Sequence, residues 1–250
     1  KEKNKMIVAL MIGRAGSVGY PKKNLIKILG KSLCEYPIIA ARKTKEIKKI
    51  YVSTDCPEIK KKTKKYNVTF LDRPKSLSNS KALGEDVYRD AYYKIKNQLE
   101  KKNQSIELIV LLMANAGTIN GKLIKKGISM LRKNKNLDSA VSTSIYNMWS
   151  PVRARKLNKK GMLEPFIPFK KYSRNVKINC DRDSQGDVFY ADMSVSVVRP
   201  KCLEQMQNGI LPQKWMGRKI GAIKSIGGFD LDFEWQLPIL EYWIKKYGKK

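Results

Sequence analysis

Apolar runs of strand length alternate with helix-length segments over the first 144 residues of the chain. The run Leu108–Met113 has no polar interruption, which is typical of a strand buried on both faces of a parallel sheet. The alternation predicts an α/β fold with a doubly wound, mostly parallel sheet. The expected strands are Met6–Ile12, Ile50–Thr54, Val68–Leu71, Glu107–Met113 and Ser139–Ser144, and the expected helices are Leu33–Lys43, Pro57–Tyr66, Ala82–Lys101 and Lys122–Asn134.

The pattern changes after Tyr146. Residues 147–186 have little periodicity and contain three prolines, so we expect a small β and loop excursion from a single domain that spans residues 1–250. Within it the segment Met162–Phe169 is apolar outside any expected core element. Cover by a second subunit and packing as a lid on the same domain are both open interpretations. Two further strands, Val188–Val198 and Ile220–Ile226, and a closing helix, Leu237–Lys246, are expected.

The composition restricts the chemistry. The chain of 250 residues contains no histidine, and its four cysteines form no C-x-x-C pair. Histidine-based triads are therefore excluded, and a zinc site is not expected. Scattered cysteines indicate a reducing, cytoplasmic location. No signal-peptide pattern is present, and no apolar run approaches the roughly 20 residues of a membrane helix, so we expect no membrane partner.

The net charge of +30, from 52 basic and 22 acidic residues, is of the size found in nucleic-acid-binding proteins. Most of the excess is lysine, and it is spread along helices and turns. Lysine is a solvated point charge, whereas arginine supplies bidentate recognition of bases and phosphates. We therefore expect no nucleic-acid partner, although the positive field would attract anionic substrates.

A glycine-rich loop follows the first expected strand. Backbone N–H groups and fixed cations at the end of a buried strand suit a phosphate-bearing ligand, although a solvated turn has a similar composition. The glycine spacing fits neither G-x-G-x-x-G nor G-x-x-x-x-G-K-[ST], which argues against a dinucleotide fingerprint and a P-loop. The loop contains three glycines, one hydroxyl and three cations: Gly13, Gly16, Gly19, Ser17, Arg14, Lys22 and Lys23.

Two aspartates follow the last expected strand. Asp230 and Asp232 come directly after Gly227-Gly228-Phe229. In an extended segment, residues i and i+2 point the same way, so the two carboxylates would share one face. Two hard oxygen donors beside phosphates suit Mg²⁺, which takes one or two carboxylates and keeps several waters. Taken alone, Asp-x-Asp is also common in solvated loops and helix caps.

Together these elements resemble the acylneuraminate and 3-deoxy-manno-octulosonate cytidylyltransferases, the CMP-sugar-acid synthetases. The loop is similar to their R-x-x-S-K-G-x-x-x-K-N element, and the aspartate pair stands where the family has its metal-binding D-x-D. The resemblance covers most of the chain. It continues through Gly30–Leu33, Val52–Asp55, Arg73-Pro74 and Ile109–Met113, and the loop positions that match are Arg14, Ser17, Gly19, Lys23 and Asn24.

The resemblance implies a Rossmann-like nucleotidyltransferase fold and a Mg²⁺-dependent transfer of CMP from CTP to an acidic 2-keto sugar, with release of pyrophosphate. It also implies a homodimer formed through residues 147–186. Arg73 would help to position the nucleotide, although a surface ion pair is an equally open interpretation. The implied catalytic residues are Arg14, Lys23, Asp230 and Asp232, the implied metal ligands are Asp230 and Asp232, and the implied nucleotide-binding residues are Gly13, Arg14, Ala15, Gly16, Ser17, Lys23, Asn24 and Arg73.

Several positions differ from the family pattern. Val18 stands where the family has a lysine, Met113 where it has a glutamine, and Asp192-Met193 where it has Asn-Gly. These changes fall largely on acceptor-side elements, so the acceptor stays open. The alternatives are a related nucleotidyltransferase with a different acceptor, and a degenerate, non-catalytic or nucleic-acid-binding member. Intact Arg14 and Asp232 argue against degeneration.

Overall fold

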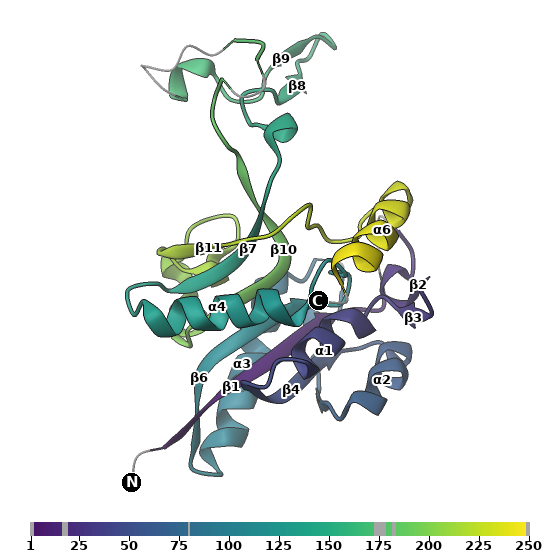
Figure 1. The fold of residues 1–250 in the computed structure, drawn as a ribbon, viewed down its shortest axis with the longest axis vertical. Helices are drawn as coiled ribbons and strands as arrows, with labels where there is room; N and C mark the ends of the chain where they lie inside the picture. Colours follow the sequence, from purple (N-terminus) through teal and green to yellow (C-terminus); the bar gives the residue numbers. More distant parts are fainter. Residues whose placement is uncertain (1–2, 17–19, 80, 173–178, 182–183, 249–250) are drawn as a thin grey trace.

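The computed structural model describes residues 3–16, 20–79, 81–172, 179–181 and 184–248. Its centre is a seven-stranded sheet with the order β11-β7-β10-β6-β1-β4-β5 (Figure 1). Among the described strands of this sheet, β10 alone runs antiparallel to its neighbours. The doubly wound, mostly parallel sheet is confirmed. Its strands are β1 (Asn4–Gly13), β4 (Ile47–Thr54), β5 (Thr69–Leu71), β6 (Gln104–Met113), β7 (Ser139–Ile145), β10 (Phe189–Val198) and β11 (Ile220–Lys224).

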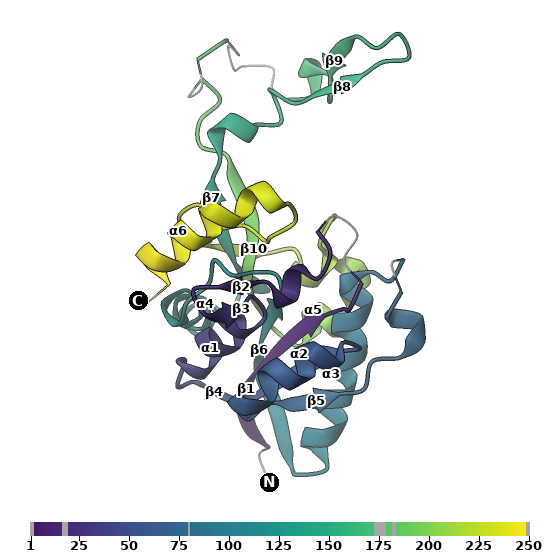
Figure 2. The same cartoon turned by 90° about the vertical axis from the view of Figure 1, so that its right-hand side faces the viewer.

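Helices cover both faces of the sheet (Figure 2). On β1 the side chains of Ile7 and Met11 join one core cluster, and those of Val8 and Leu10 join the other. Burial on both faces explains why this strand is a continuous apolar run. One face is covered by α1 (Glu35–Arg42), α2 (Pro57–Thr63), α4 (Gly121–Lys133) and α6 (Leu237–Tyr247), and the other by α3 (Gly84–Glu100) and α5 (Lys201–Glu204).

Besides short 3₁₀ helices, the structure contains two small elements that the sequence patterns did not predict. One is α5, and the other is a hairpin of β2 (Lys27–Ile28) and β3 (Lys31–Ser32). Leu29 and Gly30 both have positive φ at its turn, as a two-residue hairpin connection requires. The buried Glu35 carboxylate holds the hairpin, because Ser32 donates its backbone N–H to Oε2 at 2.7 Å. No helix in the described part of the chain is long and apolar enough to span a bilayer.

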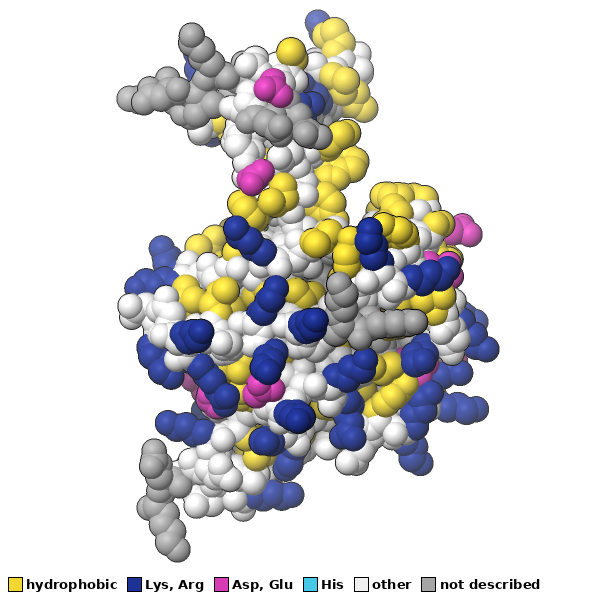
Figure 3. All heavy atoms as spheres, viewed as in Figure 1, with side chains coloured by type: hydrophobic (Ala, Val, Ile, Leu, Met, Phe, Trp, Pro, Cys, Tyr) yellow, Lys and Arg dark blue, Asp and Glu magenta, His cyan; other side chains and the backbone are white. Residues whose placement is uncertain are grey.

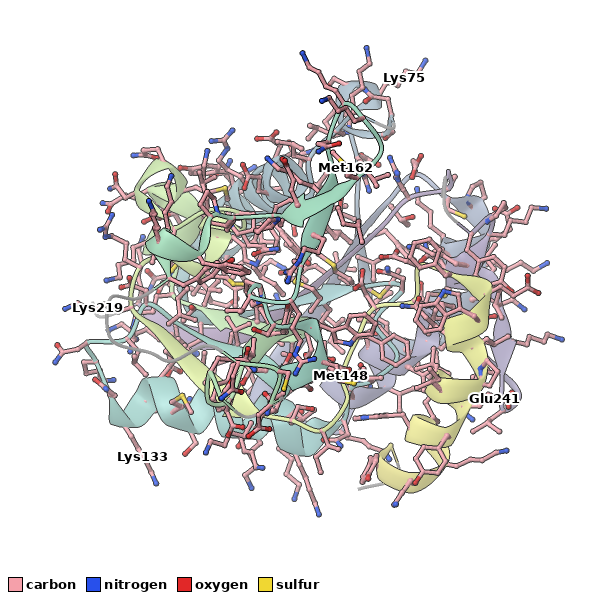
Figure 4. All side chains as sticks on the ribbon, turned by 90° about the horizontal axis from the view of Figure 1, so that it is seen from above. Lys75, Lys133, Met148, Met162, Lys219 and Glu241 are labelled. Carbon is pink, nitrogen blue, oxygen red and sulfur yellow. The ribbon has the colours of Figure 1, made fainter. Side chains whose placement is uncertain are left out.

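We call residues 147–186 the arm. Its described part, residues 147–172, 179–181 and 184–186, stands away from the rest of the molecule (Figure 1; Figure 2). The strands β7 and β10 lead into and out of it, and it contains a hairpin of β8 (Arg155–Leu157) and β9 (Leu163–Pro165). Viewed from above, Met148 and Met162 lie on the arm, whereas Lys133 and Glu241 lie on helices of the body (Figure 4). The assignment of the whole chain to one domain stays a prediction.

Hydrophobic side chains on the arm are exposed. Trp149 is 63% exposed and Phe166 is 58% exposed, and Leu163 within the segment Met162–Phe169 reaches 72%. Apolar side chains gather along the arm in the space-filling view (Figure 3). In the isolated chain this segment therefore has no protein cover from the body.

Candidate active site

A cleft of about 310 Å³ opens where β1 and β6 end. Its lining includes Ile12 and Gly13 at the end of β1, Met113 at the end of β6, and Ala114 directly after β6. In open α/β sheets, ligands bind outside the carboxyl ends of the strands, where neighbouring connections diverge. A larger groove of about 760 Å³ between α4 and β11 contains none of the predicted site residues. Six predicted residues line the smaller cleft: Gly13, Arg14, Lys23, Asn24, Arg73 and Asp232.

An ion pair between Lys23 and Asp232 joins the two sequence motifs across the cleft. Lys23 begins a short 3₁₀ helix just after the glycine-rich loop, and its side chain is only 15% exposed. The next residue, Asn24, is buried, and its amide nitrogen donates to the Arg14 carbonyl at 3.1 Å. The cation of the first motif and a carboxylate of the second therefore meet although 209 positions separate them.

The two predicted arginines hold backbone carbonyls. Arg14 Nη1 donates to the Asn79 carbonyl at 3.1 Å. Arg73 donates through Nε and Nη2 to the Leu77 carbonyl at 2.8 and 2.6 Å, and through Nη1 to the Gly13 carbonyl at 3.3 Å. Burial lowers the pKa of Arg73. The Arg73 guanidinium therefore connects the backbone at Leu77 with the backbone at Gly13 beside the cleft. Among the described residues it forms no surface ion pair.

The rest of the glycine-rich loop is partly described. Ala15 donates its backbone N–H to the Asp55 carboxylate at 3.1 Å, and Gly16 is exposed. Gly13 must lack a side chain, because a Cβ there would lie 2.6 Å from the Ala114 Cβ. Ser17 lies outside the described residues, as does the departure at position 18. The predicted phosphate cradle at 15–17 therefore stays a prediction.

Asp230 is held by a residue that the sequence patterns did not single out. The side-chain amide nitrogen of Asn115 donates to Asp230 Oδ2 at 3.0 Å, and the backbone carbonyl of Asn115 accepts the Leu231 N–H at 2.9 Å. Burial raises the pKa of Asp230 and the neighbouring Asp232 charge raises it further, while the Asn115 bond and Lys23 oppose the rise. The sequence contains one signal that could have pointed to Asn115, which is the first polar residue after the central strand.

The aspartate pair fits a metal that is shared with a ligand. Among the described residues, no group of three or more histidine, cysteine, aspartate or glutamate side chains is arranged to hold a metal. Mg²⁺ is usually bound through one or two carboxylates and completed by waters and substrate phosphates. Asp230 and Asp232 match that number of carboxylates. Asp232 lines the cleft and Asp230 does not, and a Mg²⁺ site there stays a prediction.

Comparison with known sequences identifies the family. A sequence model of the cytidylyltransferases matches residues 8–204. The chain belongs to the cytidylyltransferase family. The matched range runs from β1 to the end of α5, so it includes the glycine-rich loop, Lys23 and Arg73 but stops before Asp230.

Two curated relatives of this chain are bacterial proteins. One is the Helicobacter pylori pseudaminic acid cytidylyltransferase and UDP-2,4-diacetamido-2,4,6-trideoxy-beta-L-altropyranose hydrolase, 30% identical over 60% of this chain and 28% of the relative. The other is an Escherichia coli N-acylneuraminate cytidylyltransferase, 26% identical over 74% of this chain and 42% of the relative. The chain thus spans less than half the length of either relative.

A solved structure supports the fold. It is a CMP:2-keto-3-deoxy-manno-octonic acid synthetase complexed with CTP, and it superimposes with a TM-score of 0.68 over 97% of this chain and 99% of that chain. The sequence identity is 14%. The chain thus shares its Rossmann-like fold with that protein.

Proposed function

We propose that this protein transfers CMP from CTP to the anomeric hydroxyl of an acidic 2-keto sugar of the nonulosonic-acid or octulosonate type. The observation that carries the proposal is the Lys23–Asp232 ion pair inside the cleft. In this pair a cation that suits a triphosphate, Lys23, lies beside a carboxylate that suits a metal ion, Asp232. The names of the two bacterial relatives support an acidic sugar as acceptor.

In this reaction the sugar oxygen attacks the α-phosphorus, and the bond from that phosphorus to the bridging oxygen of the β-phosphate breaks. Pyrophosphate leaves, so the protein must mainly hold the reactants in line and neutralise charge. Lys23 and Arg14 would neutralise the triphosphate, and Asn24 would fix the turn that carries Lys23. Asp230 and Asp232 would hold Mg²⁺, which, when bound, polarises the α-phosphate.

The experiment that tests the function is pyrophosphate release from CTP and Mg²⁺ with a panel of 2-keto-3-deoxy sugar acids. We expect release with at least one acid and none when UTP replaces CTP. Stabilisation by CTP against heating without release would instead favour a related transferase with another acceptor. Absence of both signals would contradict the proposal, and tight, steeply salt-dependent duplex binding would favour nucleic acid as the ligand.

We further propose that the protein is a cytoplasmic homodimer formed through the arm. Its exposed apolar side chains form the kind of surface that a partner normally covers. The four cysteines have no disulfide partners, which supports a reducing compartment.

Leu163→Asp is expected to weaken the dimer about 100-fold, because a buried unpaired carboxylate costs several kcal/mol. Light scattering over a dilution series measures the change. Leu211→Asp is the matched control, since Leu211 lies on the body and is also 72% exposed. A monomeric wild type, or equal weakening by both variants, would contradict assembly through the arm.

A further inference from the structure

A cluster of buried polar side chains lies beneath the loop that carries Asp230 and Asp232. Its centre is the Asp192 carboxylate on β10, which is only 5% exposed. β10 pairs irregularly with β7 between Ala191 and Ser196, and Met193 has a φ of 60° there. The cluster also contains Ser142, Ser144, Ser194 and Thr118, all of which are fully buried.

One chain of hydrogen bonds runs from Asp192 to the aspartate loop. Ser144 donates its hydroxyl to Asp192 Oδ2 at 2.7 Å, and the same hydroxyl oxygen accepts the Gly228 N–H at 2.8 Å. Gly228 packs so closely that a Cβ there would lie 2.3 Å from Asp192 Oδ2. The carboxylate thus supports the turn two residues before Asp230.

A second chain supports the next residue of the same turn. The Phe229 N–H donates to Thr118 Oγ1 at 3.0 Å, and Thr118 Oγ1 lies 2.8 Å from Ser194 Oγ. The backbone N–H of Ser194 in turn donates to Asp192 Oδ1 at 3.1 Å. Both chains of hydrogen bonds therefore converge on one carboxylate.

The remaining hydrogen bond to Asp192 connects β10 with β7. Ser142 donates its hydroxyl to Asp192 Oδ1, and the Ser142 oxygen accepts the Val195 N–H at 3.0 Å. None of the ion pairs in the described part of the chain includes Asp192. A buried carboxylate is costly unless its lone pairs are satisfied, and hydrogen bonds to it are about twice as strong as neutral ones.

We propose that Asp192 is a positioning residue, which holds the loop of Asp230 and Asp232 in the orientation that receives a divalent cation together with the nucleotide triphosphate. Asp192 does not line the cleft, so it acts through Ser144 and Gly228. The inference rests on the proposed function, because it takes the two loop aspartates as metal ligands. Partners behind metal ligands commonly change metal affinity 10- to 100-fold.

Two serines on β7 allow a matched test. Ser142 and Ser144 are both fully buried and both donate to Asp192, but only Ser144 accepts the Gly228 N–H. We expect Ser144→Ala and Ser142→Ala to lower the melting temperature to a similar extent. We expect only Ser144→Ala to weaken Mn²⁺ binding to the CTP-bound protein, by about tenfold.

Mn²⁺ binding is measured by electron paramagnetic resonance with CTP and no acceptor, so the readout does not depend on turnover. Equal Mn²⁺ affinities in the two variants would overturn the positioning role and leave the proposed function standing. A wild type that binds CTP but no Mn²⁺ would overturn both. If Ser144→Ala does not fold, Asp192→Asn keeps the side-chain shape and is compared with Ser142→Ala in the same way, with the same two outcomes.

Discussion

Asp232→Asn is expected to lower kcat for pyrophosphate release by about 10²- to 10³-fold, the range for loss of one charge-stabilising group at a reacting centre. The carboxylate lines the cleft and pairs with Lys23, so the substitution removes one of the two proposed metal ligands and the negative charge that faces the Lys23 cation. Steady-state release at saturating CTP and Mg²⁺ measures the effect.

Glu234→Gln is the control for that experiment. Glu234 is an exposed carboxylate two residues further along the chain. Replacing it with the glutamine amide removes the same charge from the same region, and Glu234 does not line the cleft. We expect near wild-type kcat for Glu234→Gln. Equal kcat in the two variants would mean that Asp232 has no part in catalysis.

Lys23→Met is expected to raise the Kd for CTP by about 10- to 100-fold, because a hydrogen bond to a charged group contributes about 1.5–3 kcal/mol. The Lys23 side chain is largely shielded from water and directed into the cleft. Calorimetric titration with CTP in the absence of acceptor measures the affinity directly.

Lys22→Met provides the matched comparison, since it removes the same charge from an exposed neighbour outside the cleft. We expect a change of less than about threefold there, because an exposed cation acts only through a screened field. Equal losses of affinity in Lys22→Met and Lys23→Met would indicate that net charge, and not the position of Lys23, binds the triphosphate.

Periodicity predicted most of the fold because burial imposes it. Leu108–Met113 is apolar throughout since β6 packs on both faces, and the 17-residue α3 contains enough turns to display a buried stripe. The four residues of α5 and the two-residue strands β2 and β3 are too short to carry a period. Their existence depends on tertiary contacts such as the bond from Ser32 to Glu35.

Less of the candidate site than of the fold could be predicted from the sequence. Resemblance to a family identified Lys23 and Asp232, but only the fold brings them into contact across 209 positions. Arg73 was named without its partner, because the Leu77 carbonyl is a backbone atom that no sequence pattern marks. Asn115 and Asp192 were not named as site residues, since a single polar residue at a strand end or within a strand has many uses.

The arm and the aspartate loop share one pair of strands. β7 ends at Ile145, two residues before the arm begins and one residue beyond Ser144. β10 returns from the arm with Tyr190 paired to Ser144, two residues before Asp192. The same two strands therefore connect the exposed apolar side chains of the arm with the Ser144 hydroxyl that supports Gly228. If the proposed dimer forms through the arm, this one pair of strands links the contact between the subunits to the aspartate loop.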